Sequence, residues 1–195
     1  AVIDGDRSYS YRELDQAADR RAVELAAQGT GPGWLVPIPA PRGIAHIIEL
    51  WAIAKLGAAY SPGTAITAPH SREDMRGIAY VIHTSGTTGA PKAVAVTSRG
   101  LATLVDEAVV RYRVTPQSRV LHGYSPHFDA ALLEMLLAFG SGATLVIAPP
   151  EVTAGPPLEQ IIADQKVTHL LSTPSVLSTL DPDALPHVQV VGVGG

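Results

Sequence analysis

Residues 79–96 read AYVIHTSGTTGAPKAVAV. Two apolar runs, residues 79–84 and 93–96, enclose the segment SGTTGAPK, which is rich in glycine, serine and threonine and carries one lysine. Apolar runs joined by such a segment predict a strand, a loop and a second strand.

The loop carries the groups needed to hold a polyphosphate. Glycines let backbone N–H groups approach closely, hydroxyls donate hydrogen bonds, and the lysine adds a point charge. It is not a P-loop, because Gly86 and Gly89 are only three residues apart and a strand pattern, not a helix, follows Lys92. The plain alternative is an ordinary hairpin turn, but the lysine and the flanking strands favour a phosphate site. The residues expected to bind phosphate are Thr84, Ser85, Gly86, Thr87, Thr88, Gly89 and Lys92.

The amino-acid composition and charge narrow the classes of protein to which this chain could belong. The chain has 195 residues, 46% of them hydrophobic, which is enough for a sizeable core. The net charge is −4 without a run of lysine or arginine, which argues against nucleic acid as a partner. The longest apolar stretch, residues 44–53, is shorter than a membrane span, and charged residues 4, 6 and 7 argue against a signal peptide. With no cysteine, we expect a cytoplasmic protein without a thiol metal site.

The rest of the chain alternates between helical and strand patterns. Such alternation predicts an α/β fold in layers, with mostly parallel sheets flanked by helices. A capping box at residues 10–13 starts the first helix, and Gly29 ends it. Further helices are expected at residues 44–56, 99–112, 130–139, 158–165 and 174–180, and further strands at 34–38, 119–122, 143–148, 169–172 and 188–193.

Three segments resemble one known family. Residues 80–92, YVIHTSGTTGAPK, resemble the signature of the adenylate-forming enzymes, which include acyl-CoA synthetases, luciferases and the adenylation domains of nonribosomal peptide synthetases. Residues 10–14, SYREL, and 54–62, AKLGAAYSP, are similar to two earlier motifs of that family. The resemblance implies that ATP activates a carboxylate as an acyl-adenylate, that pyrophosphate leaves, and that the acyl group moves to a thiol.

Asp129 points to an amino acid as the substrate. At the start of a helix it could simply stabilise the helix N-terminus. Phe128-Asp129, however, resembles the peptide-synthetase motif whose aspartate pairs with the substrate's α-ammonium group. The same resemblance implies a side-chain pocket that favours an apolar amino acid, and a carrier protein with a phosphopantetheine arm as the partner. The residues implied at the pocket, besides Phe128 and Asp129, are Ala130, Leu133, Leu171, Val191 and Val193.

The sequence gives less information about an adenine site and about metal sites. Gly194 and Gly195 form a plain turn or, by the resemblance, face the adenine ring. The spacing of the seven histidines suits no metal site. The resemblance implies Mg²⁺ as a cofactor, but it places the family's magnesium ligand, ribose ligand and catalytic lysine beyond Gly195.

The chain also departs from the family pattern. Ala93 replaces a glycine whose φ could be positive, and the segment between Pro62 and Tyr80 is too short for an expected strand and helix. We therefore expect residues 1–195 to be a truncated N-terminal portion of an adenylation domain, with sub-lobes 1–77 and 78–195, that is inactive alone. The alternatives are part of an acyl or aryl acid-CoA ligase, or a non-catalytic remnant that binds a nucleotide or a partner protein.

Overall fold

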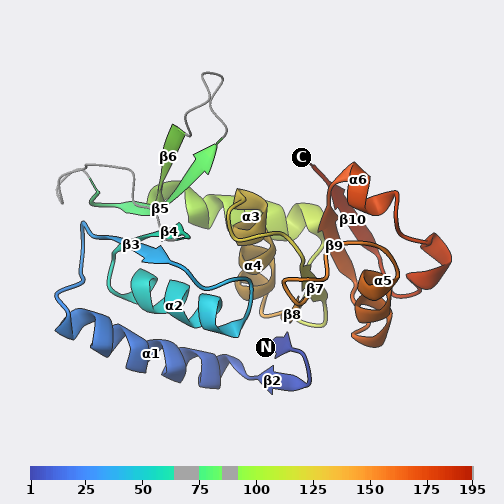
Figure 1. The fold of residues 1–195 in the computed structure, drawn as a ribbon, viewed down its shortest axis with the longest axis horizontal. Helices are drawn as coiled ribbons and strands as arrows, with labels where there is room; N and C mark the ends of the chain where they lie inside the picture. The colour runs from blue at the N-terminus through green and yellow to red at the C-terminus, as the bar shows by residue number, and fades with distance from the viewer. Residues whose placement is uncertain (64–74, 85–91, 195) are drawn as a thin grey trace. The chain divides into compact units, whose positions relative to one another are not determined.

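The structure, a computed structural model, describes residues 1–63, 75–84 and 92–194 (Figure 1). Within these residues it contains a six-stranded and a four-stranded sheet, mostly parallel and flanked by helices, which confirms the predicted α/β class. The chain divides into two compact units, each of which contains one sheet. No helix of the described residues is long and apolar enough to cross a membrane.

The first unit comprises residues 1–10, 42–44 and 103–195. Its sheet has the order β10-β9-β7-β8-β1-β2, and every neighbouring pair is parallel except β1 and β2, which form a hairpin. The strands are β1 (Val2–Asp4), β2 (Arg7–Tyr9), β7 (Arg119–His122), β8 (Thr144–Ile147), β9 (His169–Ser172) and β10 (Val190–Val193).

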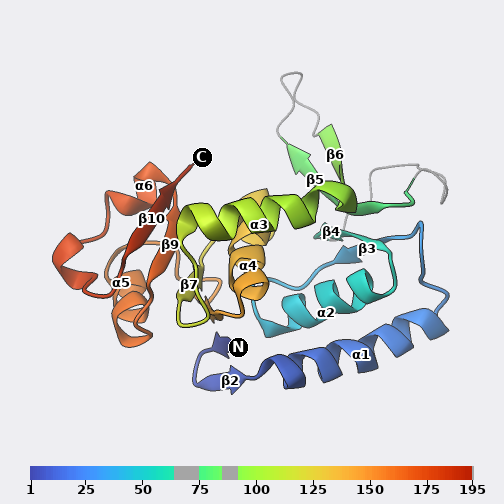
Figure 2. The same ribbon diagram turned by 180° about the vertical axis from the view of Figure 1, so that it is seen from behind.

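Helices cover both faces of this sheet. Successive strand residues point to opposite faces. Leu121 packs in a core with Leu158 and Ile162 of α5 (Gly155–Asp164), whereas His122 contacts Glu134 of α4 (Asp129–Ser141). Helix α3 (Leu101–Tyr112) lies on the same face of the sheet as α4 (Figure 2). The ring of His169 in β9 donates a hydrogen bond to the carbonyl of Tyr112, the last residue of α3.

Short elements complete the face of α5. The helix α6 (Pro174–Leu177) starts at Thr173, whose hydroxyl accepts a hydrogen bond from the N–H of Val176, and the 3₁₀ helix η2 (Pro182–Ala184) follows. Val176 and Leu177 pack against the apolar core on this face. The carboxyl ends of β7 and β9 therefore emerge between two helical layers.

The second unit comprises residues 11–41 and 45–102. Its sheet has the order β3-β4-β5-β6, with parallel pairs up to β5 and an antiparallel β5–β6 hairpin. Its elements are α1 (Tyr11–Ala27), β3 (Leu35–Ile38), α2 (Ile44–Lys55), β4 (Ala59–Pro62), β5 (Ile78–Thr84), β6 (Lys92–Thr97) and the 3₁₀ helix η1 (Ser98–Gly100).

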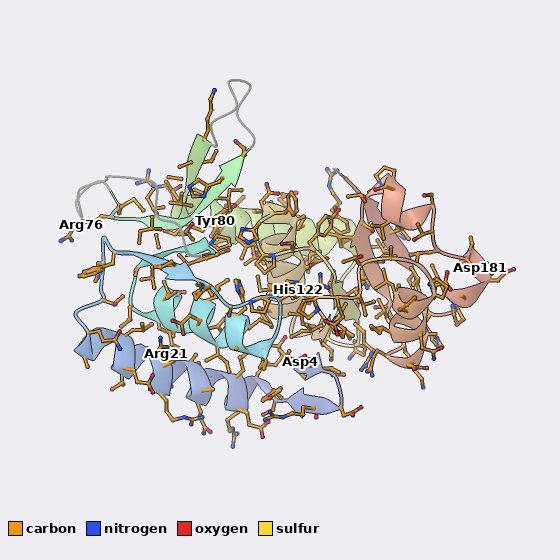
Figure 3. All side chains as sticks on the ribbon, viewed as in Figure 1. Asp4, Arg21, Arg76, Tyr80, His122 and Asp181 are labelled. Carbon is orange, nitrogen blue, oxygen red and sulfur yellow. The ribbon has the colours of Figure 1, made fainter. Side chains whose placement is uncertain are left out.

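Ion pairs join α1 to α2 in this unit. Nε of Arg21, which is labelled in Figure 3, lies 2.6 Å from a carboxylate oxygen of Glu49. Nζ of Lys55 lies 2.6 and 2.7 Å from Asp15 and Asp19. Figures 1 and 2 show the two helices side by side. The buried residues of α1 recur every three or four positions, which is the apolar stripe that a packed helix needs: Leu14, Ala18, Ala22 and Leu25.

The division into units differs from the boundary after residue 77 that the sequence suggested. Residues 78–102 belong to the unit of α1 because β5 pairs with β4, where Tyr60 lies beside Tyr80 and the two rings stack 5.7 Å apart. Residues 1–10 belong to the other unit because β1 pairs with β8.

Candidate functional site

The β5–β6 hairpin presents both ends of the predicted phosphate loop. Thr84, the last residue of β5, and Lys92, the first residue of β6, are paired in register, and both are exposed. A hydroxyl and an ammonium group thus lie on the two strands that lead to residues 85–91, and both groups suit an anionic ligand. The other predicted phosphate ligands lie outside the described residues: Ser85, Gly86, Thr87, Thr88 and Gly89.

Ala93 does not disturb the hairpin. It pairs with His83 within β6, and it is not among the described non-glycine residues with positive φ. An extended residue accepts a Cβ without strain. The expectation that alanine could block a positive φ at this position is therefore wrong.

The first unit contains a pocket of about 230 Å³ at the carboxyl ends of β7 and β9. Strand β8 lies on one side of β7, and the connection from β7 to β8 contains α4. Strand β9 lies on the other side of β7, and the connection that leads to it contains α5, which covers the opposite face of the sheet. Ligands of open α/β sheets bind at such a switch point. The apolar lining consists of Leu121, Val152, Leu158, Leu170, Leu171 and Val176, together with Phe128, and the hydroxyls are those of Tyr124, Ser125, Thr153, Ser172 and Thr173.

The structure brings some of the predicted substrate residues to this pocket. Phe128 and Leu171 line it, and Asp129 begins α4 directly after Phe128. Asp129 is exposed and is not one of the residues that line the pocket. Burial, followed by the charges of Glu134, Tyr112 and Asp129, raises the pKa of Tyr124, which does line it.

The remaining predicted residues do not line the pocket. Ala130 and Leu133 are half-buried on α4. Val191 pairs with Leu170 and Val193 with Ser172, and both valines are exposed on β10. Gly192, between them, pairs with Leu171.

Gly194, the residue after β10, is bonded to two other segments at this edge of the sheet. Its N–H donates to the carbonyl of Ser172 at 3.2 Å, and its own carbonyl accepts from the hydroxyl of Tyr124 at 3.2 Å. The loop after β7, the end of β9 and the residue after β10 therefore meet beside the pocket. Gly195, the other residue expected near adenine, lies outside the described residues.

A buried carboxylate, which the sequence analysis missed, holds the loop after β7. Glu134 is fully buried and accepts hydrogen bonds from Nδ1 of His122 at 2.8 Å, from the N–H of Gly123 at 3.1 Å and from the N–H of Tyr124 at 3.3 Å. Burial raises the pKa of Glu134, and these hydrogen bonds offset part of the rise. The signal was a lone charge in the apolar helix pattern ALLEMLLAF.

Arg42 is a second buried charge at the same loop. Its guanidinium donates to the carbonyl of Gly123, to that of Ala148 at 2.7 Å, to that of Pro149 at 2.6 Å and to that of Val152 at 3.0 Å. It is only 5% exposed, and burial lowers its pKa while the charge of Glu134 opposes the shift. Its only sequence signal was an arginine between Pro41 and Gly43.

Within the described residues, no group of three histidine, cysteine, aspartate or glutamate side chains could hold a metal ion. The buried carboxylate is already used by one histidine and two backbone N–H groups. No metal site is therefore assigned to these residues.

The chain is similar to known proteins along its whole length. It is 33% identical to novobiocin biosynthesis protein H of Streptomyces niveus over 256 residues, covering 100% of this chain and 42% of the relative. It is 38% identical over 228 residues to the probable non-canonical nonribosomal peptide synthetase CymA of Salinispora arenicola, covering 100% of this chain and 3% of the relative. The structure of the nonribosomal peptide synthetase FmoA3 bound to α-methyl-L-serine-AMP matches with a TM-score of 0.85 and 25% identity, over 100% of this chain and 28% of that one.

Both alignments to the curated relatives are longer than the 195 residues of this chain, so these relatives carry internal residues that it lacks. The family model described as "AMP-binding enzyme" matches residues 1–75 and 63–195, two segments that overlap in the region where the sequence analysis found a shortened connection. Together these matches span the chain from end to end, and the protein belongs to the AMP-binding enzyme family.

Proposed function

We propose that this chain forms the part of an amino-acid-adenylating enzyme that binds ATP and the substrate amino acid. The observation that carries the proposal is the apolar pocket at the switch point of the sheet, with Asp129 directly after the pocket residue Phe128 in the chain. An apolar lining suits an uncharged side chain, and a carboxylate beside it suits an α-ammonium group. The FmoA3 structure, which holds an amino acid joined to AMP, supports this assignment.

In the proposed reaction, the phosphate-binding residues and Asp129 have separate roles. The substrate carboxylate attacks the α-phosphorus of ATP; a carboxyl oxygen–phosphorus bond forms, and the bond to the pyrophosphate oxygen breaks. Thr84, Lys92 and the loop between them would hold the phosphates, since hydroxyls and a lysine stabilise phosphate charge. Asp129 would hold the ammonium group. A phosphopantetheine thiol of a carrier protein would then displace AMP and form a thioester.

The proposal includes ATP as a substrate. It assigns no Mg²⁺ ligand to the described residues, because they offer no cluster of three His, Cys, Asp or Glu side chains. An apolar amino acid is the proposed substrate class. The pocket hydroxyls lie mainly on the loops that follow the strands, whereas leucine and valine side chains form most of the remaining wall.

Exchange of labelled pyrophosphate into ATP, measured with the intact protein that carries this chain, tests the function. We expect exchange with one or more apolar amino acids. Exchange driven best by a charged amino acid would refute the proposed substrate class, and no exchange with any amino acid would refute the function.

Asp129→Ala distinguishes an amino-acid enzyme from an acyl or aryl acid-CoA ligase. Removing the partner of a desolvated ammonium group costs about 3–5 kcal/mol, so kcat/KM for the amino acid should fall at least a hundredfold, by the order of magnitude of that cost. A ligase for carboxylic acids without an amino group would keep its activity.

A further inference from the structure

Gly123, the first residue after β7, is held from two sides by buried charges. The carboxylate of Glu134 accepts from its N–H, and the guanidinium of Arg42 donates to its carbonyl. Glu134 is 0% exposed and Arg42 is 5% exposed. Such charges are costly to bury, so they persist where their hydrogen bonds and mutual attraction compensate.

The two charges hold backbone, and the backbone they hold forms the pocket wall. Glu134 also binds the N–H of Tyr124, and Arg42 also binds the carbonyl of Val152. Gly123, Tyr124 and Val152 all line the pocket. Arg42 thus ties the loop after β7 to the loop after β8, while Glu134 ties the first of these loops to α4.

The atoms around Gly123 also pack closely against it. A Cβ at this residue would lie 3.3 Å from Cδ2 of Leu121 and 3.8 Å from a carboxylate oxygen of Glu134. Gly123 therefore packs closely against Leu121 and the carboxylate that holds it.

We propose that Arg42 and Glu134 are positioning residues that set the shape of the pocket through Gly123. The proposal rests on the proposed function, because it takes the pocket as the substrate site. Neither side chain lines the pocket; each acts through the loops that do. Loss of either should loosen the wall that meets the amino acid, while the hairpin with Thr84 and Lys92 lies in a separate unit and should keep its affinity for ATP.

Arg42→Met and Glu134→Ala test the proposal in the intact protein by pyrophosphate exchange, with amino acid and ATP varied in turn. A misplaced wall should raise the KM for the amino acid on the order of tenfold to a hundredfold and leave the KM for ATP within about twofold. Arg42→Lys keeps the charge and Glu134→Gln keeps an acceptor oxygen, so each should recover part of the loss. If the first pair of variants fails to fold, these two carry the test.

Arg119→Met is the matched control. Arg119 also donates from its guanidinium to a backbone carbonyl, that of Gln165, but it does so at the start of β7, at the opposite edge of the same sheet. It should leave the KM for the amino acid unchanged. Equal KM changes in Arg42→Met and Arg119→Met, or equal rises for both substrates, would overturn the proposal.

Hydrogen–deuterium exchange separates this proposal from the proposed function. The N–H groups of Gly123 and Tyr124 should exchange faster in Glu134→Ala and Glu134→Gln than in the unmodified protein, because their acceptor is removed or weakened. Unchanged exchange would overturn the positioning role, whatever the enzyme activity. Faster exchange in a protein that adenylates no amino acid would reject the function alone and keep the two residues as the determinants of loop position.

Discussion

Nδ1 of His122 and a carboxylate oxygen of Glu134 lie 2.8 Å apart, and both side chains are completely buried. Nε2 of the same imidazole has no hydrogen-bond partner among the described residues. His122 thus supports the loop-holding carboxylate with one nitrogen only.

We predict that His122→Phe lowers the free energy of unfolding by about 1–3 kcal/mol, because Glu134 loses one buried hydrogen bond while the ring volume is kept. Urea denaturation measures the change. The exposed His187 provides the control, since His187→Phe should stay within about 0.5 kcal/mol. An increase in stability for His122→Phe would show that the pair is not a net stabilising contact.

Stability should fall on acidification through His169. Nε2 of this buried imidazole donates to the carbonyl of Tyr112 at 3.0 Å, and Nδ1 faces the hydroxyl of Thr168 at 2.7 Å. Burial lowers the pKa of His169, and the hydrogen bonds to the carbonyls of Tyr112 and Arg113 only partly oppose the shift. The unfolded chain therefore takes up a proton more readily, so stability is lost as the pH falls below the ordinary histidine pKa of about 6.5.

Chemical denaturation between pH 7.5 and 5.5, a range chosen to bracket roughly that ordinary value, checks this prediction. In His169→Gln, which cannot take up a proton in this range, the decline should be smaller. The same pH dependence in the variant and the unmodified protein would assign the effect to other groups.

Gly192→Ala should destabilise the first unit. A Cβ at Gly192 would lie 2.8 Å from Cε1 of Tyr112 and 3.2 Å from Cγ of Leu171, closer than carbon atoms pack. Overpacking of this kind costs about 1–3 kcal/mol, which thermal or urea unfolding detects. Gly194→Ala, two residues on, meets nothing within 4 Å and should leave the unfolding free energy unchanged. Equal effects of the two substitutions would contradict the crowding of β10 by α3.

Lys92→Met should weaken the use of ATP selectively. Loss of the exposed ammonium at the end of β6 should raise the KM for ATP about tenfold, by the order of magnitude of a hydrogen bond to a charged group, and leave the KM for the amino acid unchanged. Pyrophosphate exchange by the intact protein measures both constants. Lys166, an exposed lysine in the other unit, is the control. A matching rise in Lys166→Met would mean that net charge, not the hairpin, sets the affinity.

The local sequence pattern was sufficient to predict many of the helices and strands. The strands expected at residues 119–122 and 169–172 have those bounds in the structure, because short apolar runs between turn residues leave few alternatives. The helix expected at 130–139 runs from Asp129 to Ser141 and ends where Gly142 takes a left-handed conformation.

Long-range pairing explains what the sequence analysis missed. The strands β1, β2 and β4 are three or four residues long, too short to show a period, and they form because a partner strand is in place. The buried roles of Glu134 and Arg42 were missed for a related reason: a lone charge in an apolar context gains its meaning from backbone groups far away in sequence, such as the carbonyl of Ala148.

The pairing of β1 with β8 constrains how the chain folds during synthesis. Val2 lies beside Leu145, so the ribosome must add more than a hundred residues, roughly 7–30 s of translation, before the first strand meets its partner. Closing so long a loop is slow relative to local helix formation, which places completion of the six-stranded sheet late in folding. The unit of α1 and α2, whose last residue is Ala102, can acquire its contacts while that sheet is still being translated.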